Sequence, residues 1–547
     1  MIMARLDRTT IFKICGGSII VFSFVLAIVS KPFILVDDAW ITFRYAYNLA
    51  YHGQLTFNLN ERVEGISNML WTLVLAPQIR LSPSSVVMIT VFNTVLFTAF
   101  SLYRIWKIGI LLKINPVIAA LPPSILILSL NFYGTVTNGL EASLFTWLLV
   151  EAVYWFLKER PQISSLCLGL LFLTRPEAIV LGLVFLGVLF QPSILLEDKR
   201  RLKLQFIGLQ SKEKRSEIAR CVAVFLGIVI AATLLRLWYY HDFIPNSVRA
   251  KIVPFDLILY NSGLEYTINF SKDNPHFIFI LCMSLVYLLA KTWALFQRGG
   301  KRILTPSLPY QVMIFCFISI LFSFAVALRN GGDWMPYFRL LSQYGVLYFI
   351  MLLVILSEKV MVVYKGVLMV LFALLIFSFV QTSTLFMDRL KSGAPFTNIH
   401  YTPGFSFWDE TAERLSQAPL VPADVVSSEG IGYISYVLMD TYIHDPLGLT
   451  EKHIAREGVN GSPFGKKDIK YTVLRVKPSV MIWQYVRHLR SVDRATLDDE
   501  YLTYCHDFCN NWLDADIVMI RKDRAKDLSP YFADWELLTI SELMERK

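Results

Sequence analysis

The sequence ISSLCLGLLFLTRPEAIVLGLVFLGVLF decides how often the chain crosses a membrane. It fills most of the apolar stretch 162–190, and Arg175-Pro176-Glu177 interrupts it near the middle. A single helix through this stretch would bury both charges in the bilayer, at roughly 2.5–3.5 kcal/mol for each. Two short helices that meet at Arg175-Pro176 place the charges at a break, so the stretch predicts a pair of helices.

The basic loop that follows supports the same interpretation. Cytoplasmic loops of membrane proteins carry an excess of Lys and Arg. The loop 191–220 holds Lys199, Arg200, Arg201, Lys203, Lys212, Lys214, Arg215 and Arg220. One crossing at 162–190 would put this loop outside, whereas two crossings keep it inside.

Further apolar runs predict the remaining membrane helices. A helix needs about 20 residues to span a bilayer, and suitable runs lie near 11–35, 84–103, 115–131, 140–157, 221–240, 275–296, 311–328, 340–357 and 366–386. With the interrupted stretch they give about eleven transmembrane helices. The distribution of Lys and Arg places the N-terminus in the cytoplasm and the C-terminus outside.

The composition agrees with a polytopic α-helical membrane protein. The chain is 55% hydrophobic, only 17% charged, and has a mean hydropathy of +0.50. Its net charge of +9 sits in short loops between apolar runs, so we expect no nucleic acid as a partner.

The composition changes after the last apolar run. We predict a transmembrane domain over 1–389 and a soluble extracytoplasmic α/β domain over 390–547. Within the second domain we expect strands at 423–428, 441–445, 471–476 and 516–522, and helices at 408–417 and 479–489. Cys505 and Cys509 predict a disulfide or free thiols rather than a metal site, because two Cys and one His are an incomplete ligand set.

Polar sequences occur in the segments predicted to lie outside. They are DDAWITFRYA (37–46), NGLEAS (138–143), TRPEA (174–178), FIPNSVRAK (243–251) and NGGDWMPYFR (330–339). Adjacent carboxylates such as Asp37 and Asp38 can deprotonate a hydroxyl group, stabilise a cationic sugar, or bind a divalent cation. Arg and Lys side chains can bind a phosphate leaving group.

These sequences, together with DPLGLTEKHIAR (445–456), carry a resemblance. Across most of its length the chain resembles GT-C glycosyltransferases, which use polyprenyl-phosphate sugars, and among them most closely the terminal β-(1→2) arabinofuranosyltransferase group. The resemblance implies a bacterial cytoplasmic-membrane enzyme of the same fold class. It also implies an extracytoplasmic glycan or glycolipid as acceptor, and arabinofuranose as the expected sugar.

The resemblance implies a catalytic residue, and the residue types of the polar sequences indicate binding residues. An acidic residue in the first outer loop is catalytic, which selects Asp37 or Asp38, with Asp37 slightly preferred as the base. We expect the donor phosphate to be held by Arg175, Arg249, Lys251 and Arg339. We expect the sugar or acceptor to contact Arg44, Trp40, Glu177, Asp333 and Trp334. The metal question stays open, with a divalent cation as one candidate for the aspartates.

Two other classes of protein remain as alternatives. A transporter or flippase of lipid-linked sugars would place its functional charges near the bilayer midplane. A scaffold or receptor would need no reacting carboxylate. Arg175 and Glu177 also have a structural interpretation, as a mutually paired turn.

Overall fold

A computed structural model describes residues 7–546 apart from 191, 199–200, 207–210, 253, 255, 298–306, 359–360, 393–398, 402–404, 463–464, 485 and 511–514. Its contacts divide the chain into two compact units. The helical unit contains residues 1–33, 91–235 and 255–399. The sheet unit contains residues 34–90, 236–254 and 400–547, so it includes two earlier segments besides the predicted C-terminal domain.

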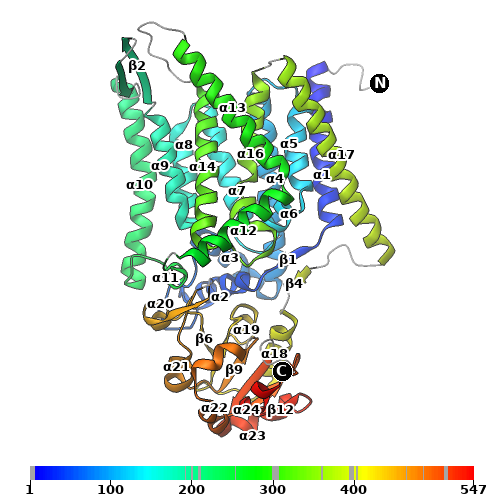
Figure 1. The fold of residues 1–547 in the computed structure, drawn as a ribbon, viewed down its shortest axis with the longest axis vertical. Helices are drawn as coiled ribbons and strands as arrows, with labels where there is room; N and C mark the ends of the chain where they lie inside the picture. Colours follow the sequence, from blue (N-terminus) through cyan, green and yellow to red (C-terminus); the bar gives the residue numbers. More distant parts are fainter. Residues whose placement is uncertain are drawn as a thin grey trace. The chain divides into compact units, whose positions relative to one another are not determined.

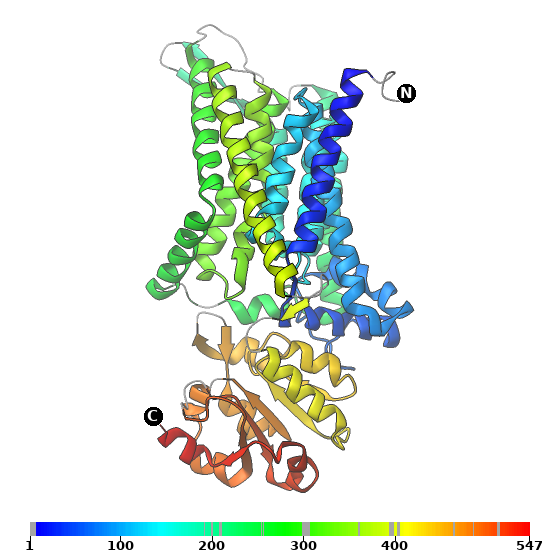
Figure 2. The same ribbon diagram turned by 90° about the vertical axis from the view of Figure 1, so that its right-hand side faces the viewer.

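Long apolar helices build the helical unit. Figure 1 shows several of them running side by side, and Figure 2 shows α1 beside α17. Among the described residues, six helices are long and apolar enough to cross a membrane: α1 (Arg8–Ser30), α10 (Lys212–Tyr240), α13 (Pro275–Gln297), α14 (Leu308–Asn330), α17 (Met361–Ser392), and η2 with α4 (Pro83–Ser85 and Val86–Leu111). Their length and composition support the expectation of a multi-pass membrane protein.

Two bent helix pairs raise the number of candidate spans to eight. The pair α5 (Pro116–Leu128) and α6 (Leu130–Val136) bends by 71°. The other pair joins η5–α15 (Pro336–Ser342) to α16 (Gly345–Ser357) and bends by 51°. Of the four shorter apolar helices among the described residues, α7 (Ala142–Leu157), α8 (Pro161–Thr174) and η3–α9 (Pro176–Leu189) would bring the number to the expected eleven, which stays a prediction. The fourth, α3 (Met69–Leu81), belongs to the sheet unit.

The remaining elements of the helical unit are short or lie between these spans. They are the hairpin β2 (Pro192–Asp198) and β3 (Arg201–Phe206), and the helix α12 (Leu257–Asp273). Two further strands, β1 (Phe33–Leu35) and β4 (Ile399–Tyr401), pair with each other.

A six-stranded mixed sheet forms the centre of the other unit. Its strand order is β12-β10-β11-β9-β5-β6. The strands are β5 (Val425–Ser428), β6 (Tyr442–His444), β9 (Val480–Trp483), β10 (Tyr501–Cys505), β11 (Ile517–Arg521) and β12 (Glu536–Leu538). The strand β5 is parallel to β6 and β9, whereas β9, β11, β10 and β12 pair antiparallel. This confirms the predicted C-terminal sheet domain.

Helices and turns surround the sheet. They are α2 (Asp37–His52), α3 (Met69–Leu81), α11 (Asn246–Lys251), α18 (Phe405–Gln417), α19 (Gly432–Val437), α20 (Lys452–Glu457), α21 (Ile469–Tyr471), η6 (Thr472–Val476), η7 (Val486–Ser491), α22 (Arg494–Glu500), η8 (Lys522–Arg524), α23 (Ala525–Leu528), η9 (Ser529–Phe532) and α24 (Ile540–Glu545). A small hairpin, β7 (Val459–Ser462) and β8 (Gly465–Lys467), lies after α20. Cys505 and Cys509 form a disulfide.

Two predicted elements of this domain are wrong. Residues 479–489 begin as strand β9 instead of a helix. In β9, Val480 and Ile482 pack in one core and Met481 and Trp483 in the other, so all four are buried. A strand buried on both faces is continuously apolar and shows no alternation, which is why it resembles a buried helix in sequence.

Residues 471–476 are the second error, because they are helical rather than extended. Asp468 caps this segment by accepting a hydrogen bond from the Tyr471 N–H at 2.9 Å. The cap lies outside the β-branched run from which a strand was predicted, and it outweighs the run's weak preference for strand.

The segment 34–90 supplies part of the core of the sheet unit. Ile41 and Tyr45 from α2, with Phe57 and Ile66, are buried in the same cluster as Val426 and Ile482. The sequence that carries the paired aspartates is thus folded into the sheet unit.

Candidate functional site

Asp37 begins α2 and is anchored to the N-terminal end of α19. Its two carboxylate oxygens accept hydrogen bonds from the Gly432 N–H (2.8 Å) and the Tyr433 N–H (2.9 Å). The residue is only 4% exposed. Burial raises the pKa of Asp37 to about 7, and Asp38 adds to this, whereas the two N–H groups oppose it. Both oxygens of Asp37 are therefore already used inside the unit.

Asp38 differs from its neighbour in this respect. It is half-buried in the first turn of α2, and its carboxylate forms no hydrogen bond or ion pair with any residue that the structure describes. The start of a helix favours a negative charge. Of the two predicted catalytic aspartates, Asp38 is the one with oxygens available to a ligand.

The close approach of Asp37 and α19 depends on a glycine. A Cβ at Gly432 would lie 1.9 Å from the Asp37 carbonyl oxygen. We expect Gly432→Ala to force α2 and α19 apart and to destabilise the sheet unit by roughly 1–3 kcal/mol. Gly227→Ala in α10 is the control, because its Cβ would meet nothing within 4 Å. Equal melting temperatures for the two variants in thermal unfolding would refute this packing.

Arg44 and Trp40, which were predicted to contact sugar, are buried in the sheet unit. The Arg44 guanidinium donates to the carbonyl oxygens of Phe57, Ser435, Leu438 and Thr441 and to the Asn58 Oδ1. Arg44 is 2% exposed, and its guanidinium group also lies over the Phe57 ring. These bonds occupy its donors, so Arg44 holds loops together.

Trp40 packs among aromatic rings. Its ring centroid lies 4.9 Å from that of Tyr433 and 5.2 Å from those of Phe43 and Tyr436. Trp40 is 4% exposed, so little of its surface is available for stacking on a sugar. Its contacts extend the packing of α2 on α19.

The sequence FIPNSVRAK also lies in the sheet unit, around α11. The Asn246 Nδ2 donates to the carbonyl oxygens of Gly448, Leu449 and Glu451 at 2.9–3.1 Å, which fixes α11 on DPLGLTEKHIAR. Two of the sequences that carried the resemblance are therefore in direct contact.

The two predicted phosphate ligands of this segment differ. Arg249 pairs with Asp242 at 2.7 Å, and Asp242 also pairs with Arg456 at 3.0 Å. Lys251 is exposed and forms no ion pair within the described parts of the chain. Lys251 is thus the available cation of this segment.

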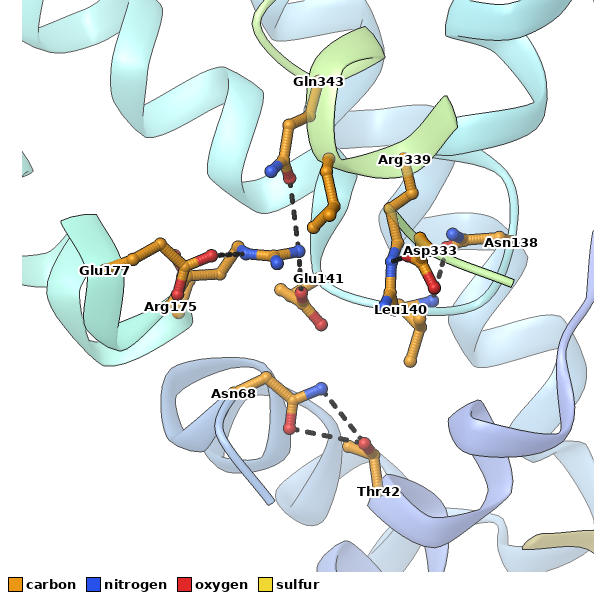
Figure 3. A network of polar contacts seen from close by, with 12 residues as sticks. Thr42, Asn68, Asn138, Leu140, Glu141, Arg175, Glu177, Asp333, Arg339 and Gln343 are labelled. Carbon is orange, nitrogen blue, oxygen red and sulfur yellow. Dashed lines mark hydrogen bonds and ion pairs between the residues drawn. The ribbon is translucent and has the colours of Figure 1, made fainter. Parts of the chain in front are cut away.

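A second polar cluster lies within the helical unit (Figure 3). At the break between α8 and α9, the Arg175 Nε donates to Glu177 at 2.6 Å. The Arg175 Nη1 donates to Glu141 at 3.1 Å and lies 3.4 Å from the Gln343 Oε1. The predicted pairing of Arg175 with Glu177 is confirmed, and Glu141 from NGLEAS is an additional partner.

The loop 331–339 contributes a further pair to this cluster. Arg339 donates to Asp333 at 2.8 Å and also interacts electrostatically with Glu177. Gly331 and Gly332 have φ of +73° and +85°, and a Cβ there would lie 2.5–2.7 Å from Leu259 and Tyr266. These glycines let the loop pack on α12. Trp334, in the same loop, is 45% exposed.

Carboxylates and guanidinium groups pair in this cluster. Glu141 and Glu177 pair with Arg175, and Asp333 pairs with Arg339. Carboxylates can accept hydrogen bonds from hydroxyl groups, whereas a guanidinium group can donate to a phosphate. The Arg175 Nη2 donates no hydrogen bond to any described residue, and it is the cluster's clearest donor for a ligand.

A buried histidine gives the sheet unit a pH dependence. His444 is 2% exposed, and its Nε2 lies 3.0 Å from the Thr472 Oγ1. Burial lowers the pKa of His444 to about 4. The unfolded chain, with a pKa of about 6.5, therefore binds one more proton between pH 6.5 and 4. This part of the stability is present above pH 6.5 and is lost as the pH falls towards 4.

We therefore expect the melting temperature of the wild type to fall more steeply than that of His444→Gln between pH 7.5 and 5. Because other groups also titrate, the quantity to measure is the difference between the two proteins in the slope of melting temperature against pH. Identical slopes would show that His444 does not carry this effect.

Several residues that organise the site were missed in the sequence. Glu64 and Arg236 form a buried ion pair, with exposures of 3% and 7%. The sequence EGIGY (429–433) contains Gly432, whose close contact with Asp37 a two-glycine pattern does not indicate, because such a pattern is at most a weak nucleotide-loop match. The signal for this ion pair in the sequence is Glu64 within a loop and Arg236 near the end of an apolar helix.

No protein-family model matches the chain, and no curated protein sequence matches it. The functional conclusion below therefore depends on the residues and their geometry.

Proposed function

We propose that the chain is an integral membrane glycosyltransferase. It would transfer a sugar, with arabinofuranose as the first candidate, from a polyprenyl-phosphate donor to an extracytoplasmic glycan or glycolipid. The protein would lie in the bacterial cytoplasmic membrane, with its N-terminus in the cytoplasm and the sheet unit outside.

The observation that carries this proposal is the division between Asp37 and Asp38. Asp37 is held by two backbone N–H groups, whereas Asp38 has no partner among the described residues. In the reaction, Asp38 takes the proton of the acceptor hydroxyl group as its oxygen attacks the anomeric carbon. The bond from that carbon to the phosphate oxygen breaks, and polyprenyl phosphate leaves with the electron pair.

Other residues supply binding in this account. In the sheet unit, Lys251 is the cationic donor that would contact the phosphate; in the helical unit, the corresponding donor is the Arg175 Nη2. Glu177 and Asp333 would accept hydrogen bonds from sugar hydroxyl groups, and the exposed ring of Trp334 would contact a sugar face. Arg249 and Arg339 already have carboxylate partners, so their contribution to phosphate binding is smaller.

A reconstitution experiment tests the proposal. Purified full-length protein is placed in vesicles that contain a synthetic polyprenyl-phosphate arabinofuranose, and a soluble oligosaccharide acceptor is added outside. We expect an acceptor lengthened by one sugar, detected by mass spectrometry. Movement of intact donor between leaflets without product would indicate a flippase, and the absence of both would favour a scaffold. A parallel sample with chelator determines whether transfer needs a divalent cation.

A further inference from the structure

The end of strands β10 and β11 next to the disulfide brings together three groups that can bind a metal. Beyond Cys505, where β10 ends, the His506 N–H donates to the Asp516 carbonyl at 2.9 Å. The Asp516 N–H donates to the Asp507 carbonyl at 3.1 Å. These two backbone bonds continue the ladder between β10 and β11 and fix the three residues opposite one another.

The side chains of these residues converge. One ligand atom from each of His506, Asp507 and Asp516 lies within 4.8 Å of the other two. The His506 Nδ1 is 2.8 Å from the Asp507 Oδ2, although the two atoms lack hydrogen-bond geometry. Such a separation suits two atoms that bind the same ion.

Asp516 provides an independent indication of a missing ligand. It is only 5% exposed, and its Oδ1 has no hydrogen-bond partner within the described residues. A buried carboxylate that faces a second carboxylate needs a compensating positive charge.

We propose that His506, Asp507 and Asp516 form a binding site for one divalent transition-metal ion, with Zn²⁺ as the first candidate. The ligands would be the His506 Nδ1, the Asp507 Oδ2 and the Asp516 Oδ1, with water completing the coordination. Mixed imidazole and carboxylate ligands suit Zn²⁺, whereas Ca²⁺ and Mg²⁺ prefer oxygen alone.

The neighbours of His506 are arranged as such a site requires. The His506 Nε2 lies 3.2 Å from the Glu410 Oε2, so Glu410 can hold the ring with its Nδ1 directed at the ion. The Cys505–Cys509 disulfide closes the short loop that carries His506 and Asp507. Asp507 is exposed, so the site is open to solvent.

The position of the site indicates a structural role. The ion would join the ends of β10 and β11 to α18, which carries Glu410. This inference is independent of the proposed transferase activity, and it differs from the divalent cation considered for Asp37 and Asp38.

Calorimetric titration of Zn²⁺ into chelator-treated, untagged full-length protein tests the inference. We expect one Zn²⁺ per chain and a rise in melting temperature of about 5 °C at saturating metal. Asp516→Asn should abolish both effects. Because this variant removes an unpaired buried charge, it should melt near the wild-type temperature without metal. Glu410→Gln should weaken binding about 10–100-fold.

Asp468→Asn is the matched control. Asp468 lies 3.3 Å from His453, so this variant also removes a carboxylate next to a histidine in the same unit. It should bind Zn²⁺ like the wild type. Absence of stoichiometric Zn²⁺ binding to the wild type, or unchanged binding to Asp516→Asn, would overturn the inference. Tighter binding of Mn²⁺ than of Zn²⁺ would overturn the choice of metal.

Discussion

Asp38→Asn is expected to lower the initial rate of sugar transfer by roughly 10²–10⁴-fold, the usual contribution of a general base. Its melting temperature should stay near that of the wild type, because Asp38 forms no hydrogen bond or ion pair with the described residues. An amide of the same size cannot take the proton from the acceptor. The measurement is the transfer rate at equal concentrations of folded protein.

Asp37→Asn is the matched comparison for Asp38→Asn. The carboxylate of Asp37 accepts two backbone N–H groups, and an amide would point its NH₂ group at one of them. We expect a loss of about 1–3 kcal/mol in stability and a lower melting temperature. If Asp38→Asn destabilised the protein as much as Asp37→Asn, the distinction between the two aspartates would be wrong.

Arg44→Met is expected to produce the largest loss of stability. The substitution keeps an apolar side chain in the space that Arg44 fills, but it removes the donors to four carbonyl groups and one amide oxygen. Buried acceptors without partners cost about 1–3 kcal/mol each when nothing replaces the bond. Because partial relaxation is expected, we estimate a total of roughly 3–5 kcal/mol and a fall in melting temperature of roughly 10 °C.

Arg414→Met provides the control for Arg44→Met. Arg414 pairs with Glu410 and Asp534 at the surface, and its side chain is 25% exposed. Its loss should lower the melting temperature far less, because exposed ion pairs contribute about 0–1 kcal/mol. Equal effects of the two substitutions would mean that Arg44 does not hold the loops of the sheet unit together.

The helical unit could be predicted largely from the sequence because its signal is local. An apolar run of membrane length is visible without any knowledge of its neighbours. The charged break at Arg175-Pro176-Glu177 also lies within a few residues, and its internal ion pair followed from the same sequence. Glu141, the second partner of Arg175, is 34 residues away and could not be paired with it from composition alone.

The sheet unit was harder to predict because its determinants are distant in sequence. Gly432 must be small because Asp37 approaches it, and 395 positions separate the two. The prediction that Arg44 contacts sugar or acceptor is wrong, because its guanidinium group is buried and hydrogen-bonded within the sheet unit. Its actual partners include Ser435, Leu438 and Thr441, which lie in a segment with no sequence signal that connects it to α2.

The central claim is that Asp38 serves a transfer from lipid phosphate to a glycan. The most direct test measures polyprenyl phosphate released and sugar gained by the acceptor in the same reaction, for the wild type and for Asp38→Asn. The account predicts equal molar amounts of both products for the wild type and almost none for the variant. Equal product from both proteins, or donor cleavage without a lengthened acceptor, would contradict it.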